Sequence, residues 1–246
     1  MSPFGNAEFG NFMAVTIHVG HYVQRKVAGL TLNVDTLWAT AIAIVVVLGL
    51  GFAVRARATS GVPGRLQVIW ELIIDAVTKQ VESTIGPRGA RIVPLAICLF
   101  FVILISNWVE MLPNITHPAL FPAPTADVNT TMGYAFLVII LVHIASIREK
   151  GIGGYVGHYF KPYVFLFPVN VIEEVAKPFT LALRLFGNMF AGGLMLALIV
   201  ALPWVYVSMP VATIWKLFDM GIGAIQAFIF ALLTILYFEM GMTDAH

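Results

Sequence analysis

The sequence predicts an all-α polytopic membrane protein. Five helices cross the membrane, one amphipathic helix lies at its surface, and the last two spanning helices are long and oblique to the membrane. Composition is the first indication: 59% of the residues are hydrophobic and 11% are charged, whereas soluble domains have about 45–50% apolar and about 25% charged residues. The second indication is a set of apolar runs that are long enough to span a bilayer. The third is that the basic residues all fall on one side of the membrane in a five-span arrangement.

The N-terminal part of the chain holds the first span. Residues 1–34 are expected outside the membrane, and residues 35–55 form a span that starts with Asp35 or Thr36 as its N-cap. The segment 61–64, Gly-Val-Pro-Gly, then breaks the helix.

Residues 65–86 change the pattern to an amphipathic helix. Apolar residues recur at helical spacing on one side, namely Leu66, Ile69, Trp70, Ile73, Ile74, Val77 and Val81. The other side carries the charged residues Glu71, Asp75, Lys79 and Glu82. A helix with so many charges is unsuited to spanning, so we expect it at the membrane surface.

The middle of the chain holds two spans of ordinary length. Residues 91–112 form the second span, with Glu110 near its far end, and residues 131–148 form the third. A Gly-rich connector follows over residues 151–162.

The last two helices are too long to cross the bilayer upright. The fourth span, residues 164–202, has Arg184 near its midpoint and reaches roughly 55 Å. The fifth, residues 211–240, reaches roughly 45 Å, whereas the hydrocarbon layer is about 30 Å thick. Both helices therefore tilt, and together they form a hairpin.

The basic residues orient the protein. Those that flank the spans are Arg55, Arg57, Arg65, Arg88, Arg91, Arg148, Lys150 and Lys161. The loops 113–130 and 203–210 contain no Lys or Arg. Because basic loops stay on the cytoplasmic side, the N-terminus is expected outside and the C-terminus in the cytoplasm.

Arg184 is the central candidate for function. A cation at mid-membrane costs about 2.5–3.5 kcal/mol on insertion scales, so it is rarely left facing lipid. Counting in steps of three and four places it on one stripe with Glu173, Lys177, Thr180, Asn188 and Gly192. The alternative is a buried arginine that only ties two helices together.

The last helix carries a second polar stripe, which consists of Asp219, Gly223, Gln226, Phe230, Thr234 and Tyr237. On the predicted outer side, Asp219 comes near Gly192, Gly193 and Glu110. On the inner side, Glu173, Glu174 and Tyr237 form another polar group. A cation between two wet pockets that never join prevents a simple proton leak.

Several short strings carry a resemblance to a known family. They are Asn33-Val-Asp-Thr36, Gly61-Val-Pro-Gly-Arg-Leu-Gln67, Asn107-Trp-Val-Glu-Met-Leu-Pro113, Lys150-Gly-Ile-Gly-Gly154, Phe167-Pro-Val-Asn170, Lys177-Pro with Arg184-Leu-Phe-Gly-Asn-Met189, and Gln226-Ala-Phe-Ile-Phe230. In this order, over nearly the whole chain, they resemble subunit a of the bacterial F-type ATP synthases.

The resemblance implies the stator half of the proton channel, inert as an enzyme on its own. Arg184 would face the carboxylates of a rotating c-subunit ring, with Asn188 and Gln226 at matching family positions beside it. The b-subunit peripheral stalk and the F1 head would be further partners. Many members have Glu where Gly193 stands and His where Asp219 stands, so here Asp219 with water is expected to do the work of that pair.

Two other readings are a secondary proton or cation transporter and a structural membrane scaffold. Such transporters usually show internal repeats or broken half-helices, and a scaffold does not explain the mid-membrane Arg184.

The net charge of +1 offers no basic face for nucleic acid, and the single Cys98 in an apolar run offers no thiolate metal site. We expect no cofactor. H⁺ and Na⁺ both remain candidate ions, because in this family the ion ligands lie chiefly on the ring.

Overall fold

The computed structural model describes residues 24–27, 30–59, 61, 63–109, 123–160, 163–202 and 204–242. Its helices are α1 (Val34–Arg57), α2 (Arg65–Ile85), α3 (Val93–Val109), α4 (Val128–His158), α5 (Phe167–Val200) and α6 (Val205–Met242), with short 3-10 turns at Pro87–Arg91, Pro124–Ala126 and Val164–Leu166. Two short antiparallel strands, β1 (Gln24–Val27) and β2 (Leu30–Asn33), precede α1. The all-α membrane fold is thereby confirmed, and the β-hairpin is an addition that the sequence did not predict.

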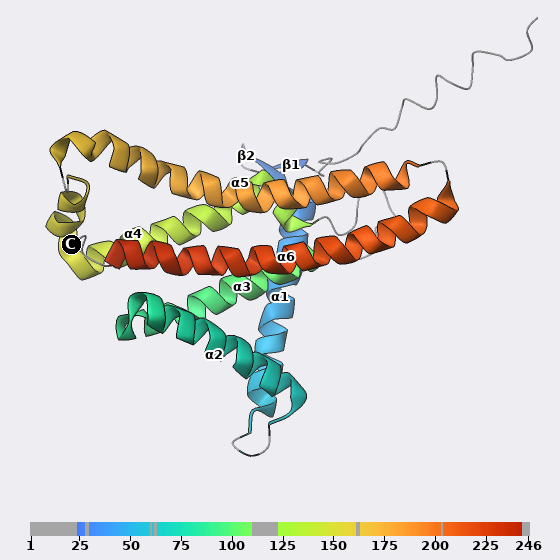
Figure 1. The fold of residues 1–246 in the computed structure, drawn as a ribbon, viewed down its shortest axis with the longest axis horizontal. Helices are drawn as coiled ribbons and strands as arrows, with labels where there is room; N and C mark the ends of the chain where they lie inside the picture. The colour runs from blue at the N-terminus through green and yellow to red at the C-terminus, as the bar shows by residue number, and fades with distance from the viewer. Residues whose placement is uncertain are drawn as a thin grey trace, which may run out of the picture.

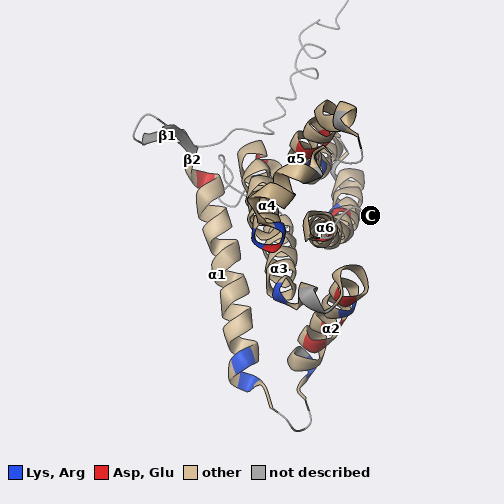
Figure 2. Ribbon diagram, turned by 90° about the vertical axis from the view of Figure 1, so that its left-hand side faces the viewer, with Lys and Arg blue, Asp and Glu red and all other residues tan. Residues whose placement is uncertain are grey.

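Five of the described helices, all except α2, are long and apolar enough to cross a membrane. The 24 residues of α1 make a helix of about 36 Å, which matches a bilayer core crossed nearly upright. Its charges lie only at its ends, with Asp35 in the first turn and Arg55 and Arg57 in the last (Figure 2).

The hairpin of α5 and α6 runs across the direction of α1 (Figure 1). These helices contain 34 and 38 residues, or about 51 Å and about 57 Å. An upright α1 therefore leaves the hairpin strongly inclined, as the sequence predicted.

The core lies where α3 is enclosed by its neighbours. Ile103 of α3, Leu181 and Leu185 of α5, and Phe230 of α6 are almost wholly buried and belong to one apolar cluster. This cluster fixes α5 and α6 against the shorter helices, and so sets which faces of the hairpin stay exposed.

The amphipathic α2 packs its apolar face on the bundle and keeps its charges outside. Val81 of α2 is buried in a cluster with Ala96 of α3 and Ile235 of α6. On the exposed side, Lys79 Nζ lies 2.7 Å from Asp75 Oδ2, and this contact raises the pKa of Lys79. Both features agree with a surface helix.

Several element ends differ from the predicted ones. The second span was predicted over residues 91–112 and α3 covers Val93–Val109 of it, while residues 110–112 lie outside the described residues. The third was predicted over 131–148, but α4 starts at Val128, where the Asp127 side chain accepts a hydrogen bond from the Asn129 backbone N–H at 2.9 Å. It also continues to His158 across a break at Gly151, because a glycine can take the positive φ of 72° that redirects the chain.

The fifth span starts earlier than predicted. The turn was expected over residues 203–210 and the helix from residue 211, but α6 begins at Val205 and contains Pro210. A proline removes one helical hydrogen bond, which membrane helices tolerate when neighbouring groups compensate.

Candidate functional site

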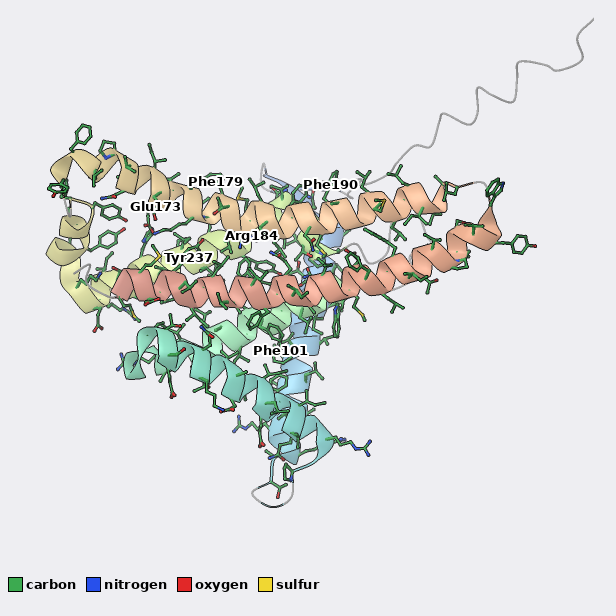
Figure 3. All side chains as sticks on the ribbon, in the orientation of Figure 1. Phe101, Glu173, Phe179, Arg184, Phe190 and Tyr237 are labelled. Carbon is green, nitrogen blue, oxygen red and sulfur yellow. The ribbon has the colours of Figure 1, made fainter. Side chains whose placement is uncertain are left out.

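Arg184 lies midway along α5 on an exposed face (Figure 3). Its neighbours Leu181 and Leu185 point into the core, which leaves the guanidinium outside the packed bundle. Among the residues that the structure describes, no hydrogen bond or ion pair reaches it. A tether between helices would require such a partner, so the geometry does not favour the purely structural interpretation.

The exposed face around Arg184 differs from the stripe counted on the sequence. Its members at helical spacing are Glu173, Thr180, Arg184, Gly187 and Ala191, all exposed. Asn188 and Gly192 turn instead toward the bundle, because each four-residue step rotates about 40° past a full turn. The face therefore has an acidic residue, Glu173, at one end and the cationic Arg184 in the middle. Beyond Arg184 it carries the small residues Gly187 and Ala191, where another helix can approach closely.

Asp219 of α6 lies against the backbone of Gly192 in α5. A Cβ atom at position 192 would come within 2.8 Å of the Asp219 carboxyl carbon, so no side chain fits there while the carboxylate keeps its place. The Trp215 indole N–H also donates to the Gly192 carbonyl at 3.1 Å. The structure thus brings together Asp219 and Gly192, as the two stripes predicted.

Two side-chain amides flank this region. Gln226 of α6 is buried, with 6% of its surface exposed, and Asn188 of α5 is half-buried. Within the described part of the chain, Gln226 Nε2 and Asn188 Nδ2 have no hydrogen-bond partner. A buried amide donor left unpaired is unfavourable by about 1–3 kcal/mol, so each is suited to bind water or a carboxylate oxygen.

A buried pair of hydrogen bonds at Asn107, one of which joins α3 to α6, was not predicted from the sequence. The Asn107 side chain donates to the Gly223 carbonyl at 2.9 Å and accepts a hydrogen bond from the Thr125 hydroxyl at 2.6 Å. Gly223, expected at the α5–α6 interface, therefore admits Asn107 of α3, whose Cβ would lie 3.1 Å from a Cβ at that glycine. Asn107 is in one of the quoted strings, but periodicity does not show which distant carbonyl it meets.

The inner polar group gathers around Glu174. This carboxylate lies 2.7 Å from Lys177 Nζ and 3.8 Å from His143 Nδ1. The Lys177 ammonium also lies 5.9 Å from the centre of the Tyr237 ring on α6. The cluster thus connects three helices, and it contains Glu174 and Tyr237 as predicted, whereas Glu173 is exposed on the face of Arg184.

Two tyrosines beyond the Gly151 break complete the inner cluster. The Tyr155 hydroxyl lies 3.3 Å from His143 Nδ1 and 2.8 Å from the Tyr159 hydroxyl. Burial, with Tyr155 and Glu174 adding to it, raises the pKa of Tyr159. His143 is therefore part of a polar cluster.

Glu110, the other predicted outer carboxylate, lies outside the described residues. In the ranges that are described, no group of three or more His, Cys, Asp or Glu side chains is placed to hold a metal ion.

Comparison with known proteins identifies the family. A family model described as ATP synthase A chain matches residues 36–239. The chain belongs to the ATP synthase A chain family. Among its relatives is ATP synthase subunit a of Acidothermus cellulolyticus, 48% identical over 242 residues that cover 95% of this chain and 89% of the relative.

Two further members of the family show how far the similarity extends. ATP synthase subunit a of Mycobacterium tuberculosis is 46% identical over 239 residues, covering 94% of this chain and 95% of the relative. That of Desulforamulus reducens is 32% identical over 232 residues, covering 92% of this chain and 86% of the relative. The resemblance that the motifs predicted is confirmed, and the family places the chain in ATP synthesis and proton transport at a bacterial membrane.

Proposed function

We propose that this chain is the stator half of the Fo proton path, in which Arg184 faces the carboxylates of a rotating c ring between two offset half-channels. The observation that carries the proposal is the exposed guanidinium at the middle of α5, with no partner among the described residues. Gly187 and Ala191 on the same face leave room for a ring helix. The ATP synthase A chain family supports the same role.

The outer half-channel is built around Asp219. Its half-buried carboxylate, the cleared space at Gly192 and the amides of Asn188 and Gln226 offer a polar route from the outside to the level of Arg184. Glu110 is proposed at its mouth. A carboxylate at Asp219 takes a proton from water and passes it toward the ring.

The inner half-channel starts near Glu173 and passes the cluster of Glu174, Lys177 and Tyr237. A ring carboxyl loaded from the outer side travels through lipid in its neutral form. When it reaches Arg184, the nearby cation stabilises the ionised carboxylate, and the proton leaves on the inner side. The same cation repels protons that would pass directly between the half-channels.

The proton-motive force supplies the energy. One charge crossing 100 mV yields about 2.3 kcal/mol, so several protons combine for each ATP. The chain itself carries out no chemical step and acts with the c ring, the b-subunit stalk and the F1 head. Its N-terminus is proposed outside and its C-terminus in the cytoplasm. A secondary transporter is the weaker alternative, because the family and the exposed Arg184 both favour a stator that meets a ring.

Replacement of Arg184 tests the proposal. In membranes matched for assembled complex, Arg184→Ala is expected to abolish ATP synthesis and to open a passive proton leak that a ring inhibitor blocks. Arg184→Lys should keep part of the barrier because the charge persists, yet couple poorly because an ammonium lacks the planar guanidinium fork. An assembled Arg184→Ala complex that remains fully coupled would rule the mechanism out.

A further inference from the structure

A cavity outside the proposed proton path lies where α3, α4 and α6 meet. Its volume is about 620 Å³, and its wall combines two guanidiniums, Arg91 and Arg148, with apolar side chains. The apolar part includes Ile92 just before α3, Leu95 of α3 and Ile144 of α4. The cavity is thus cationic on one part of its wall and hydrocarbon-like on another.

The two arginines come from separate elements. Arg91 ends the 3-10 turn before α3, and Arg148 follows the apolar stretch of α4 just before the Gly151 break. Both are exposed, and neither has an ion-pair or hydrogen-bond partner within the described ranges. Both also belong to the basic residues that the sequence assigns to the cytoplasmic side, so the cationic wall lies at the depth of lipid headgroups.

Glu149 lies on the same wall, which leaves the cavity with two cations against one carboxylate. Glu149 also takes part in an interaction of its own. The excess of positive charge favours an anion, and guanidiniums bind phosphate with two parallel hydrogen bonds. A free phosphate ion uses the arginines only, whereas the apolar wall needs hydrocarbon to cover it.

We propose that this cavity binds one anionic phospholipid of the cytoplasmic leaflet, with its phosphate between Arg91 and Arg148 and its acyl chains along the apolar wall. Basic pockets between membrane helices on this side are suited to such headgroups. Because α3, α4 and α6 all contribute residues to the cavity wall, the lipid fills the interface between the C-terminal end of α6 and the helices α3 and α4. The site is distinct from Arg184 and does not depend on the proposed proton path.

A photoreactive lipid probe tests the site in the intact complex. The complex is reconstituted in vesicles of phosphatidylethanolamine that contain a trace of phosphatidylglycerol with a photoreactive acyl chain, and labelled peptides are mapped by mass spectrometry. Labelling is expected within residues 92–96 and 141–145, which line the cavity or lie next to its wall. A phosphatidylcholine probe with the same acyl chain should label these peptides much less.

Arginine variants complete the test. Arg91→Gln and Arg148→Gln should each weaken labelling about fivefold, the effect of one basic residue near an anionic surface, and the double variant should lose nearly all of it. Arg57→Gln, an exposed arginine in the last turn of α1 that does not line the cavity, is the matched control and should label normally. Equal labelling by both probes, undiminished labelling in the assembled single variants, or a crosslink from these residues to another subunit instead of the lipid would overturn the proposal.

Discussion

The close contact of Asp219 with Gly192 shows how one residue sets the identity of another. The carboxylate occupies the volume that any side chain at position 192 would need. This carboxylate lies directly against the bare backbone of α5. Gly192 therefore leaves the space that lets the Asp219 carboxylate keep this position, whereas the conformation of the helix alone would accept alanine.

A methyl group at position 192 is expected to displace the carboxylate. Gly192→Ala should reduce ATP-driven proton pumping in inverted vesicles, because overpacking of this kind costs about 1–3 kcal/mol and moves Asp219 away from its position. Gly133→Ala in α4 is the control, since a Cβ there meets nothing within 4 Å. Equal pumping by the two assembled variants would contradict the packing argument.

The charge of Asp219 is tested separately from its shape. Asp219→Asn keeps the volume beside Gly192 but removes the group that binds and releases a proton. We expect ATP synthesis to fall at least tenfold with assembly retained, measured against His143→Gln, which changes the inner cluster and leaves the outer side intact. Undiminished synthesis in the Asp219→Asn complex would show that Glu110 or water alone conducts protons on the outer side.

Single residues also show where sequence reasoning ends. The motif predicted Arg184 as the central residue, and the stripes predicted that Asp219 lies near Gly192, as it does in the structure. Asn188, counted in steps of four on the face of Arg184, turns about 40° further toward the bundle in the structure. Asn107 could not be given its role, because its partner Gly223 is 116 residues away and no local pattern encodes that distance.

At the scale of elements, α4 departs most from its prediction. Charges at 148–150 and several glycines predicted that the helix ends there, and its apolar part does end there. The structure adds a further stretch to His158, set at an angle by Gly151, with φ 72° and ψ 167°. This stretch carries Tyr155 back onto His143, so the inner cluster depends on a backbone break that composition alone did not reveal.

The break at Gly151 should tolerate no side chain. Residues other than glycine reach this region of φ and ψ only at a cost of about 1–3 kcal/mol, so Gly151→Ala is expected to straighten the chain and separate Tyr155 from His143. Gly153→Ala is the matched control, because Gly153 is also exposed and has no positive φ. Differential hydrogen exchange over residues 152–160 should rise in the first variant only; equal exchange in both would argue against a strained hinge.

The long elements were predicted better because their signal is strong. An apolar run that exceeds the bilayer thickness predicts an inclined helix whatever its neighbours do, and α5 and α6 both have this length. Their ends were less certain, because Pro210 marks a break in most soluble helices but is accommodated inside α6.

At the scale of the whole molecule, a side-chain hydrogen bond joins the start of α1 to the start of α4. The Asn33 amide, just before α1, donates to Asp127 Oδ2, just before α4, at 2.6 Å. The starts of α1 and α4 therefore lie together, which agrees with a five-span protein whose first and third spans enter the membrane from one side. The charge distribution along α1 points the same way, with its arginines at the opposite end.

The direction of the whole bundle can be measured with single cysteines. In a Cys98→Ser background, needed because Cys98 is exposed, a cysteine at Ala58 or Gly153 should react with an impermeant maleimide only from the cytoplasmic side. A cysteine at Tyr206, a position 96% exposed near the start of α6, should react only from outside.

The reason for these sides is electrostatic. Arg55 and Arg57 lie close to position 58, and Arg148 lies close to position 153, whereas residues 203–210 contain no Lys or Arg. Basic segments are retained in the cytoplasm. The result also decides the direction of proton flow, because Asp219 lies toward the Tyr206 end of α6 and Tyr237 toward the other. Labelling with the sides exchanged would make Asp219 part of the inner half-channel and Glu174 part of the outer one.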